Sequence, residues 1–87
     1  MSIYRIHRRD TTEPEIEQAL FAAGARIVKI DSPCDLLVLF RGDLFMLEIK
    51  SKGGKLRPIQ TMAIEAGWPI TVCFDADDAL KAIGAVK

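Results

Sequence analysis

The stretch that decides the fold runs Leu36-Leu37-Val38-Leu39-Phe40-Arg41-Gly42-Asp43-Leu44-Phe45-Met46-Leu47-Glu48-Ile49-Lys50. Two apolar runs flank a short turn sequence, which predicts a β-hairpin with strands over residues 36–40 and 44–50. The first run contains no polar residue, which is typical of a strand buried on both faces. Side chains alternate along a strand, so Glu48 and Lys50 emerge together on one face at its end.

Helices and further strands are expected on both sides of this hairpin. Thr12, with Glu15 three residues later, predicts a capping box that starts a helix, and Gly24 is suited to end it. A second helix starting near Pro58 is expected to bury an apolar stripe that includes Met62. The full set of expected elements is a helix over 12–24, strands over 25–30, 36–40 and 44–50, a helix over 58–67, a strand over 69–74 and a helix from 75 onward.

Length and composition indicate a single globular domain. The chain has 87 residues, of which 49% are hydrophobic and 28% charged, so disorder is not expected. The formal net charge is zero, although basic residues cluster at 5–9 and 50–57. Neither an apolar leader nor a run of about 20 apolar residues is present, so we expect a cytoplasmic protein with no membrane partner. Cys34 and Cys73 lack metal-ligand spacing and are expected to be buried, reduced thiols.

Asp35 gives the hairpin a chemical interpretation. It stands at the head of the first strand, and folding of the hairpin brings it to the end of the sheet from which Glu48 and Lys50 emerge. Two carboxylates can hold a Mg²⁺ ion that keeps several waters, and a nearby lysine can position a water or polarise a phosphate. A Glu-x-Lys pair alone is more often a solvated ion pair. The upstream aspartate favours metal-dependent phosphodiester hydrolysis.

The arrangement Asp35 … Glu48-Ile49-Lys50 resembles the PD-(D/E)XK nucleases. The continuation Lys50-Ser51-Lys52-Gly53-Gly54-Lys55-Leu56-Arg57-Pro58-Ile59-Gln60 is similar to the VRR-NUC branch, in which a glycine-rich basic loop precedes a Pro-x-Gln helix start. The resemblance runs from Thr12 to about Ile83. It implies an α/β, minimal restriction-endonuclease-like fold with an αβββαβ core and a C-terminal helix. The whole chain, 1–87, would be one such domain with a basic N-terminal arm over 1–11.

The resemblance also implies roles for individual residues. Glu13 would be a metal ligand from the first helix, with Glu17 as the alternative, although Glu13 equally fits a first-turn acid that complements the helix dipole. The chain departs from the family pattern where Cys34 separates Pro33 from Asp35. The implied catalytic residues are Asp35, Glu48, Lys50 and Gln60; the implied metal ligands are Asp35, Glu48, the carbonyl of Ile49, and Glu13; the implied DNA contacts are Ser51, Lys52, Lys55, Arg57, Arg8 and Arg9.

The expected function is that of a Mg²⁺- or Mn²⁺-dependent endonuclease acting on DNA. The resemblance implies cleavage of branched DNA, such as four-way junctions, in phage or prophage replication or repair. A homodimer would supply the two symmetric cuts that a junction needs. The alternatives are a nucleic-acid-binding module that keeps the fold without cutting, and a structural protein in which the three charged residues form a surface ion-pair cluster.

Overall fold

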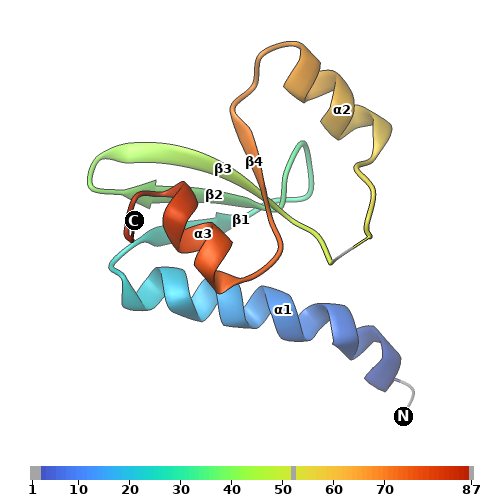
Figure 1. Ribbon diagram of the computed structural model, residues 1–87, viewed down its shortest axis with the longest axis horizontal. Helices are drawn as coiled ribbons and strands as arrows, with labels where there is room; N and C mark the ends of the chain where they lie inside the picture. The colour runs from blue at the N-terminus through green and yellow to red at the C-terminus, as the bar shows by residue number, and fades with distance from the viewer. Residues whose placement is uncertain (1–2, 52, 87) are drawn as a thin grey trace.

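The computed structural model describes residues 3–51 and 53–86, with side chains from residue 12 onward. Over these residues helices and strands follow one another as one α/β domain (Figure 1). The element order of the expected fold class is confirmed. The elements are α1 (Ile3–Ala22), β1 (Arg26–Lys29), β2 (Leu36–Phe40), β3 (Asp43–Ile49), α2 (Pro58–Glu65), β4 (Ile70–Cys73) and α3 (Ala76–Ala82).

The four strands form one mixed sheet in the order β1-β2-β3-β4. The first three strands pair antiparallel, whereas β3 and β4 pair parallel because α2 lies in the connection between them. The predicted hairpin is confirmed, with Leu39 opposite Leu44 and Phe40 opposite Asp43. Both turn residues have positive φ, 53° at Arg41 and 86° at Gly42, as a two-residue turn matching the strand twist requires.

The hydrophobic core lies on one face of the sheet. Along β2 and β3 the inward positions alternate with outward ones, as the pleat of a strand demands. α1 and α3 also contact each other, so they form one helical layer over this face. The buried core residues are Ile16, Leu20, Ala25, Leu36, Val38, Phe40, Leu47, Cys73, Ala79 and Ile83.

Both cysteines are buried and free, as expected. Burial raises the pKa of the Cys73 thiol to about 12, and the nearby carboxylates of Asp78 and Asp75 add to the shift. Burial also raises the pKa of the Cys34 thiol. These thiols therefore stay protonated near neutral pH.

The predicted start of the first helix is wrong. The α1 backbone begins at Ile3 rather than Thr12, so Pro14 lies inside the helix. The basic N-terminal arm over residues 1–11 stays a prediction. Extending an existing helix costs little compared with nucleating one, so the capping signal at Thr12 does not set its start. The side chains of Arg8 and Arg9, predicted DNA contacts, lie outside the described residues. No helix of the described chain is long and apolar enough to cross a membrane.

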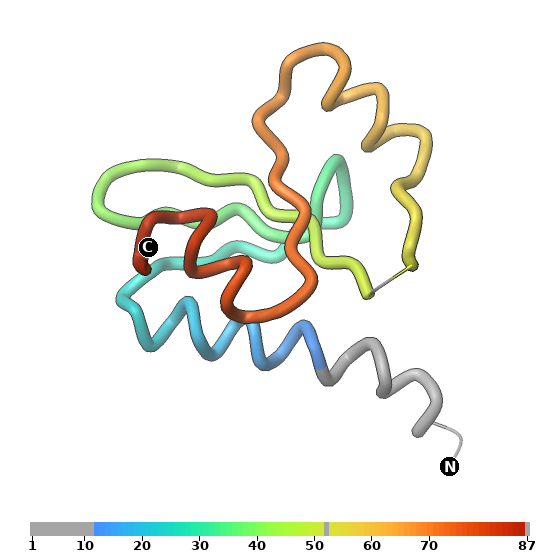
Figure 2. Tube along the Cα trace, in the orientation of Figure 1, coloured from blue at the N-terminus to red at the C-terminus, as the bar shows by residue number. Residues whose placement is uncertain are grey.

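The predicted burial of the α2 apolar stripe is also wrong. Ile59 and Met62 are exposed, and Gln60 is the buried residue of this helix. Gln60 Oε1 accepts a hydrogen bond from the backbone N–H of Arg57 at 2.9 Å, which fixes the first turn with Gln60 inward. The helix extends away from the sheet, as the Cα trace also shows (Figure 2), so its apolar residues have no core to face.

Candidate active site

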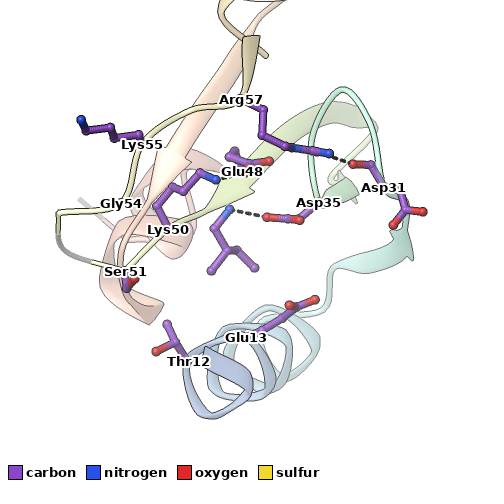
Figure 3. Close-up of a pocket in the computed structure, with 11 residues that line it drawn as sticks. Thr12, Glu13, Asp31, Asp35, Glu48, Lys50, Ser51, Gly54, Lys55 and Arg57 are labelled. Atoms are coloured by element: carbon purple, nitrogen blue, oxygen red, sulfur yellow. Dashed lines mark hydrogen bonds and ion pairs between the residues drawn. The ribbon is translucent and has the colours of Figure 1, made fainter. Parts of the chain in front are cut away.

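A cavity of about 440 Å³ lies at the end of the sheet where the predicted site residues gather (Figure 3). Three parts of the chain form its walls: α1, the connection between β1 and β2, and the end of β3 with the loop that follows. The lining residues are Thr12, Glu13, Asp31, Asp35, Glu48, Ile49, Lys50, Ser51, Gly54, Lys55 and Arg57.

Asp35 is held against β3 by two hydrogen bonds. Its backbone N–H donates to the carbonyl of Leu47 at 3.1 Å, which extends the hairpin by one rung. Its carboxylate Oδ2 accepts from the backbone N–H of Ile49 at 2.8 Å. Because Ile49 is next to Glu48 and Lys50 in the chain, this second bond ties Asp35 to the strand end that carries them. The predicted proximity of these residues is confirmed.

Glu48 and Lys50 form an ion pair at the end of β3. Lys50 Nζ lies 3.1 Å from Glu48 Oε2, and their side chains are 19% and 3% exposed. The other carboxylate oxygen, Glu48 Oε1, is buried and has no hydrogen-bond partner among the described residues. A buried carboxylate oxygen without a partner is costly, so this atom is poised to accept a ligand that the protein itself does not supply.

Glu13 brings a third carboxylate to the cavity from α1. Burial raises the pKa of Glu13. The positive charge of Lys29 lowers it, and the nearby carboxylates of Asp35 and Glu17 raise it further. Lys29 Nζ lies 3.8 Å from Glu13 Oε2 and 3.4 Å from Glu17 Oε2. Glu17 is not among the residues that line the cavity, so Glu13 is the acid of α1 that reaches it.

The loop after β3 forms the basic wall of the cavity. Arg57 Nη2 donates to the carbonyl of Asp31 at 2.7 Å, which joins this loop to the connection before β2 (Figure 3). Gly54 N–H donates to the carbonyl of Ser51 at 2.8 Å, and a Cβ at Gly54 would lie 3.0 Å from that oxygen. Glycine therefore permits the tight turn that presents Lys55 to the cavity. Lys52, a predicted DNA contact, lies outside the described residues.

Gln60 is not brought to the cavity. It is fully buried at the start of α2, where its Oε1 is bonded to Arg57 N–H and its Nε2 has no partner among the described residues. Its role toward a phosphate stays a prediction. Sequence reasoning did not single out Asp31 or treat Thr12 as a site residue, because each had a sufficient local explanation as a strand breaker and a helix cap.

The donor chemistry at the strand end fits a hard divalent cation. Within the described residues no three His, Cys, Asp or Glu side chains are grouped closely enough to hold a metal ion. Mg²⁺, however, commonly takes one or two protein carboxylates and fills its remaining positions with water and phosphate oxygens. Asp35 and the unpartnered oxygen of Glu48 meet that need. Glu13 and the Ile49 carbonyl stay predicted ligands.

No protein-family model, curated protein or solved structure matches the chain. The resemblance to VRR-NUC nucleases, drawn from the sequence between Thr12 and about Ile83, stays a prediction.

Proposed function

We propose that this chain is a Mg²⁺- or Mn²⁺-dependent endonuclease of the VRR-NUC type that hydrolyses DNA phosphodiester bonds. The observation that carries the proposal is the unpartnered, buried Oε1 of Glu48 beside Lys50, in a cavity that Asp35 also lines. A solvated ion pair would leave both carboxylate oxygens in water. Here one oxygen is kept out of water without a protein donor, as a metal-binding carboxylate would be.

Asp35, Glu48 and the Ile49 carbonyl would hold the metal, with Glu13 as a further ligand. A bound metal would supply charge neutralisation at the phosphate and a more acidic water. Lys50, held by Glu48, would direct its ammonium group at the phosphate and stabilise the negative charge that develops there. Lys55 and Arg57 would bind the adjacent phosphates, because they line the same cavity.

We further propose branched DNA as the substrate, a homodimer as the active form, and the cytoplasm of a bacterial or phage-infected cell as the setting. These proposals follow from the similarity to VRR-NUC nucleases. A second candidate function is a binding module that does not cut. It is favoured by the lack of a three-residue metal-ligating group in the described chain.

Cleavage assays separate the two functions. Labelled four-way junction, flap, single-stranded and duplex DNA are incubated at low salt with Mg²⁺, Mn²⁺ or EDTA, since phosphate contacts weaken as salt rises. We expect metal-dependent cleavage that falls by about 10²–10⁴-fold in Lys50→Met and in Glu48→Gln. Glu65→Gln and Lys81→Met change the same residue types on exposed helix positions and should cut at the wild-type rate.

DNA binding without cleavage in every metal would replace the nuclease by the binding module. Absence of both binding and cleavage would refute both functions.

A further inference from the structure

Gln60 is a buried polar residue that the chemistry of the cavity does not account for. Its side chain is fully buried, and it does not line the cavity. Its Oε1 accepts the backbone N–H of Arg57 at 2.9 Å, whereas its Nε2 has no hydrogen-bond partner among the described residues. A buried N–H without a partner costs stability, so a residue kept only for packing would be apolar here. The acceptor oxygen is therefore the part of Gln60 that the structure uses.

The bond from Gln60 completes the fixing of the Arg57 backbone. Pro58 follows Arg57 and restricts it to extended backbone, with φ −74° and ψ 155°. The carbonyl of Arg57 accepts the backbone N–H groups of Gln60 and Thr61 at 2.9 and 3.1 Å. Because Arg57 stands just before α2, its own N–H has no partner within the helix, and Gln60 supplies one. The direction in which the Arg57 side chain leaves the backbone is thereby set.

The side chain of Arg57 links the loop after β3 to the connection between β1 and β2. Its Nη2 donates to the carbonyl of Asp31 at 2.7 Å (Figure 3). The backbone N–H of Ile30 donates to the carbonyl of Asp35 at 2.8 Å, which closes this connection. Asp35 is itself bonded to β3 through Ile49 N–H. Arg57 is therefore fixed to the same segment that ends in the proposed metal ligand Asp35.

The guanidinium of Arg57 keeps donors for a phosphate while it is bonded to Asp31. A guanidinium carries several N–H groups in a planar fork, and the bond to Asp31 uses one of them. Arg57 is exposed and lines the cavity, so a ligand there can reach the group. An arginine that is already held in place loses less rotamer freedom when it binds a phosphate, which is worth about 2- to 12-fold in affinity.

We infer that Gln60 is a positioning residue that acts through Arg57. It holds the Arg57 guanidinium against the Asp31 carbonyl, where the arginine binds a backbone phosphate of the nucleic acid. The phosphate in this inference rests on the proposed function, whereas the link between Gln60 and Arg57 does not. A direct contact between Gln60 and a phosphate would use the amide N–H groups, because a phosphate oxygen accepts hydrogen bonds. The inference assigns the work to the other end of the amide and keeps Gln60 away from the substrate.

Trypsin cleavage of the Lys55–Leu56 bond tests the link without DNA. Gln60→Met removes the acceptor, and Arg57→Met removes the side-chain bond that it positions. Each variant should be cut about 5- to 30-fold faster than the wild type, the effect of losing one hydrogen bond on which the loop depends. Gln60→Glu keeps an acceptor at the helix position where glutamate commonly caps, and it should be cut at the wild-type rate. Gln18→Met and Arg26→Met make the same changes at exposed positions outside the cavity and are the matched controls.

Binding of a labelled four-way junction in EDTA, where a metal-dependent enzyme does not cut, tests the consequence for phosphate binding. Arg57→Met should lower the salt dependence of the affinity by about one phosphate contact. Gln60→Met should weaken binding about 2- to 12-fold in the wild type. It should have no further effect in the Arg57→Met background, because a residue that acts through Arg57 has nothing left to position. A residue that only stabilised the fold would weaken binding equally in both backgrounds.

Three results would overturn the inference. The first is trypsin cleavage of Gln60→Met at the wild-type rate, and the second is cleavage of Gln60→Glu as fast as that of Gln60→Met. The third is an equal loss of DNA affinity on adding Gln60→Met to the wild type and to Arg57→Met. A wild-type protein that binds no DNA would overturn the proposed function and the phosphate role of Arg57, and the trypsin rates would still decide whether Gln60 holds Arg57 in place.

Discussion

Replacing Asp35 by asparagine and by alanine separates the structural task of this carboxylate from its proposed task as a metal ligand. Its Oδ2 accepts the backbone N–H of Ile49 at 2.8 Å in a partly buried position. Alanine leaves that N–H without a partner, which costs about 1–3 kcal/mol of stability. For a domain of this size each 1 kcal/mol lowers Tm by about 4–8 °C. We therefore expect Asp35→Ala to melt roughly 5–20 °C below the wild type.

Asparagine keeps an amide oxygen as the acceptor. Loss of the charge weakens the hydrogen bond but also relieves the repulsion between Asp35 and Glu13. The stability of Asp35→Asn should then lie within about 1 kcal/mol of the wild type. Its metal binding should still be impaired, because an amide oxygen is a weaker Mg²⁺ ligand than a carboxylate.

Thermal unfolding with and without Mg²⁺ measures both effects. A ligand present at 100 times its Kd stabilises the native state by about 2.7 kcal/mol. Wild-type Tm should rise accordingly with Mg²⁺, and Asp35→Asn should lose this rise together with at least about 100-fold of cleavage activity. Wild-type stability in Asp35→Ala would refute the structural task. A Mg²⁺-dependent Tm rise and full cleavage in Asp35→Asn would refute the metal-binding task.

Two further predictions concern the other charged residues of the cavity. Lys50→Met leaves the buried Glu48 carboxylate without its counter-charge. The free energy of unfolding, measured in urea, should fall by about 3 kcal/mol, which is the low end of the range for a buried pair because Lys50 is 19% exposed. Adding Glu48→Gln should restore most of the lost stability, and a double variant that stays unstable would contradict this account. Glu13→Gln should stabilise the metal-free protein near neutral pH, because burial raises the pKa of Glu13 and so disfavours its charged form. Below the ordinary pKa of 4.5 the carboxyl is neutral in both folded and unfolded states, so the difference should disappear there. Urea unfolding across that range checks the sign, with Glu15→Gln as an exposed control on α1; an equal effect at acid and neutral pH would show that the charge is not the cause.

The hairpin and its charged end could be predicted because their signals are local. A polar turn between two apolar runs fixes the register, and the register fixes that Glu48 and Lys50 share a face near Asp35. Alternation along a strand depends on backbone geometry alone, so packing elsewhere does not change it.

Long-range packing decided the parts that sequence reasoning missed. The orientation of α2 depends on Gln60 facing inward, and the periodicity of Ile59 and Met62 gave no indication of it. Asp31 and Thr12 line the cavity only because α1 and the connection before β2 meet there in three dimensions. Neither residue stands in a motif with the other lining residues, so spacing could not have found them.

The carboxylates at the end of the sheet and the basic loop of the cavity are held in place in different ways. Glu48 belongs to β3, which has a hydrogen-bonded strand on each side, and Asp35 is bonded to that strand. Among the described residues of the basic loop, Gly54 closes a turn with Ser51 and Arg57 bonds to the connection before β2. In the proposed nuclease, changes of length or charge between residues 51 and 57 would therefore alter nucleic-acid binding while the carboxylates stay in place. Recognition and chemistry in the proposed nuclease would then lie on parts of the chain that can vary separately, an arrangement that allows new substrate preferences without rebuilding the site.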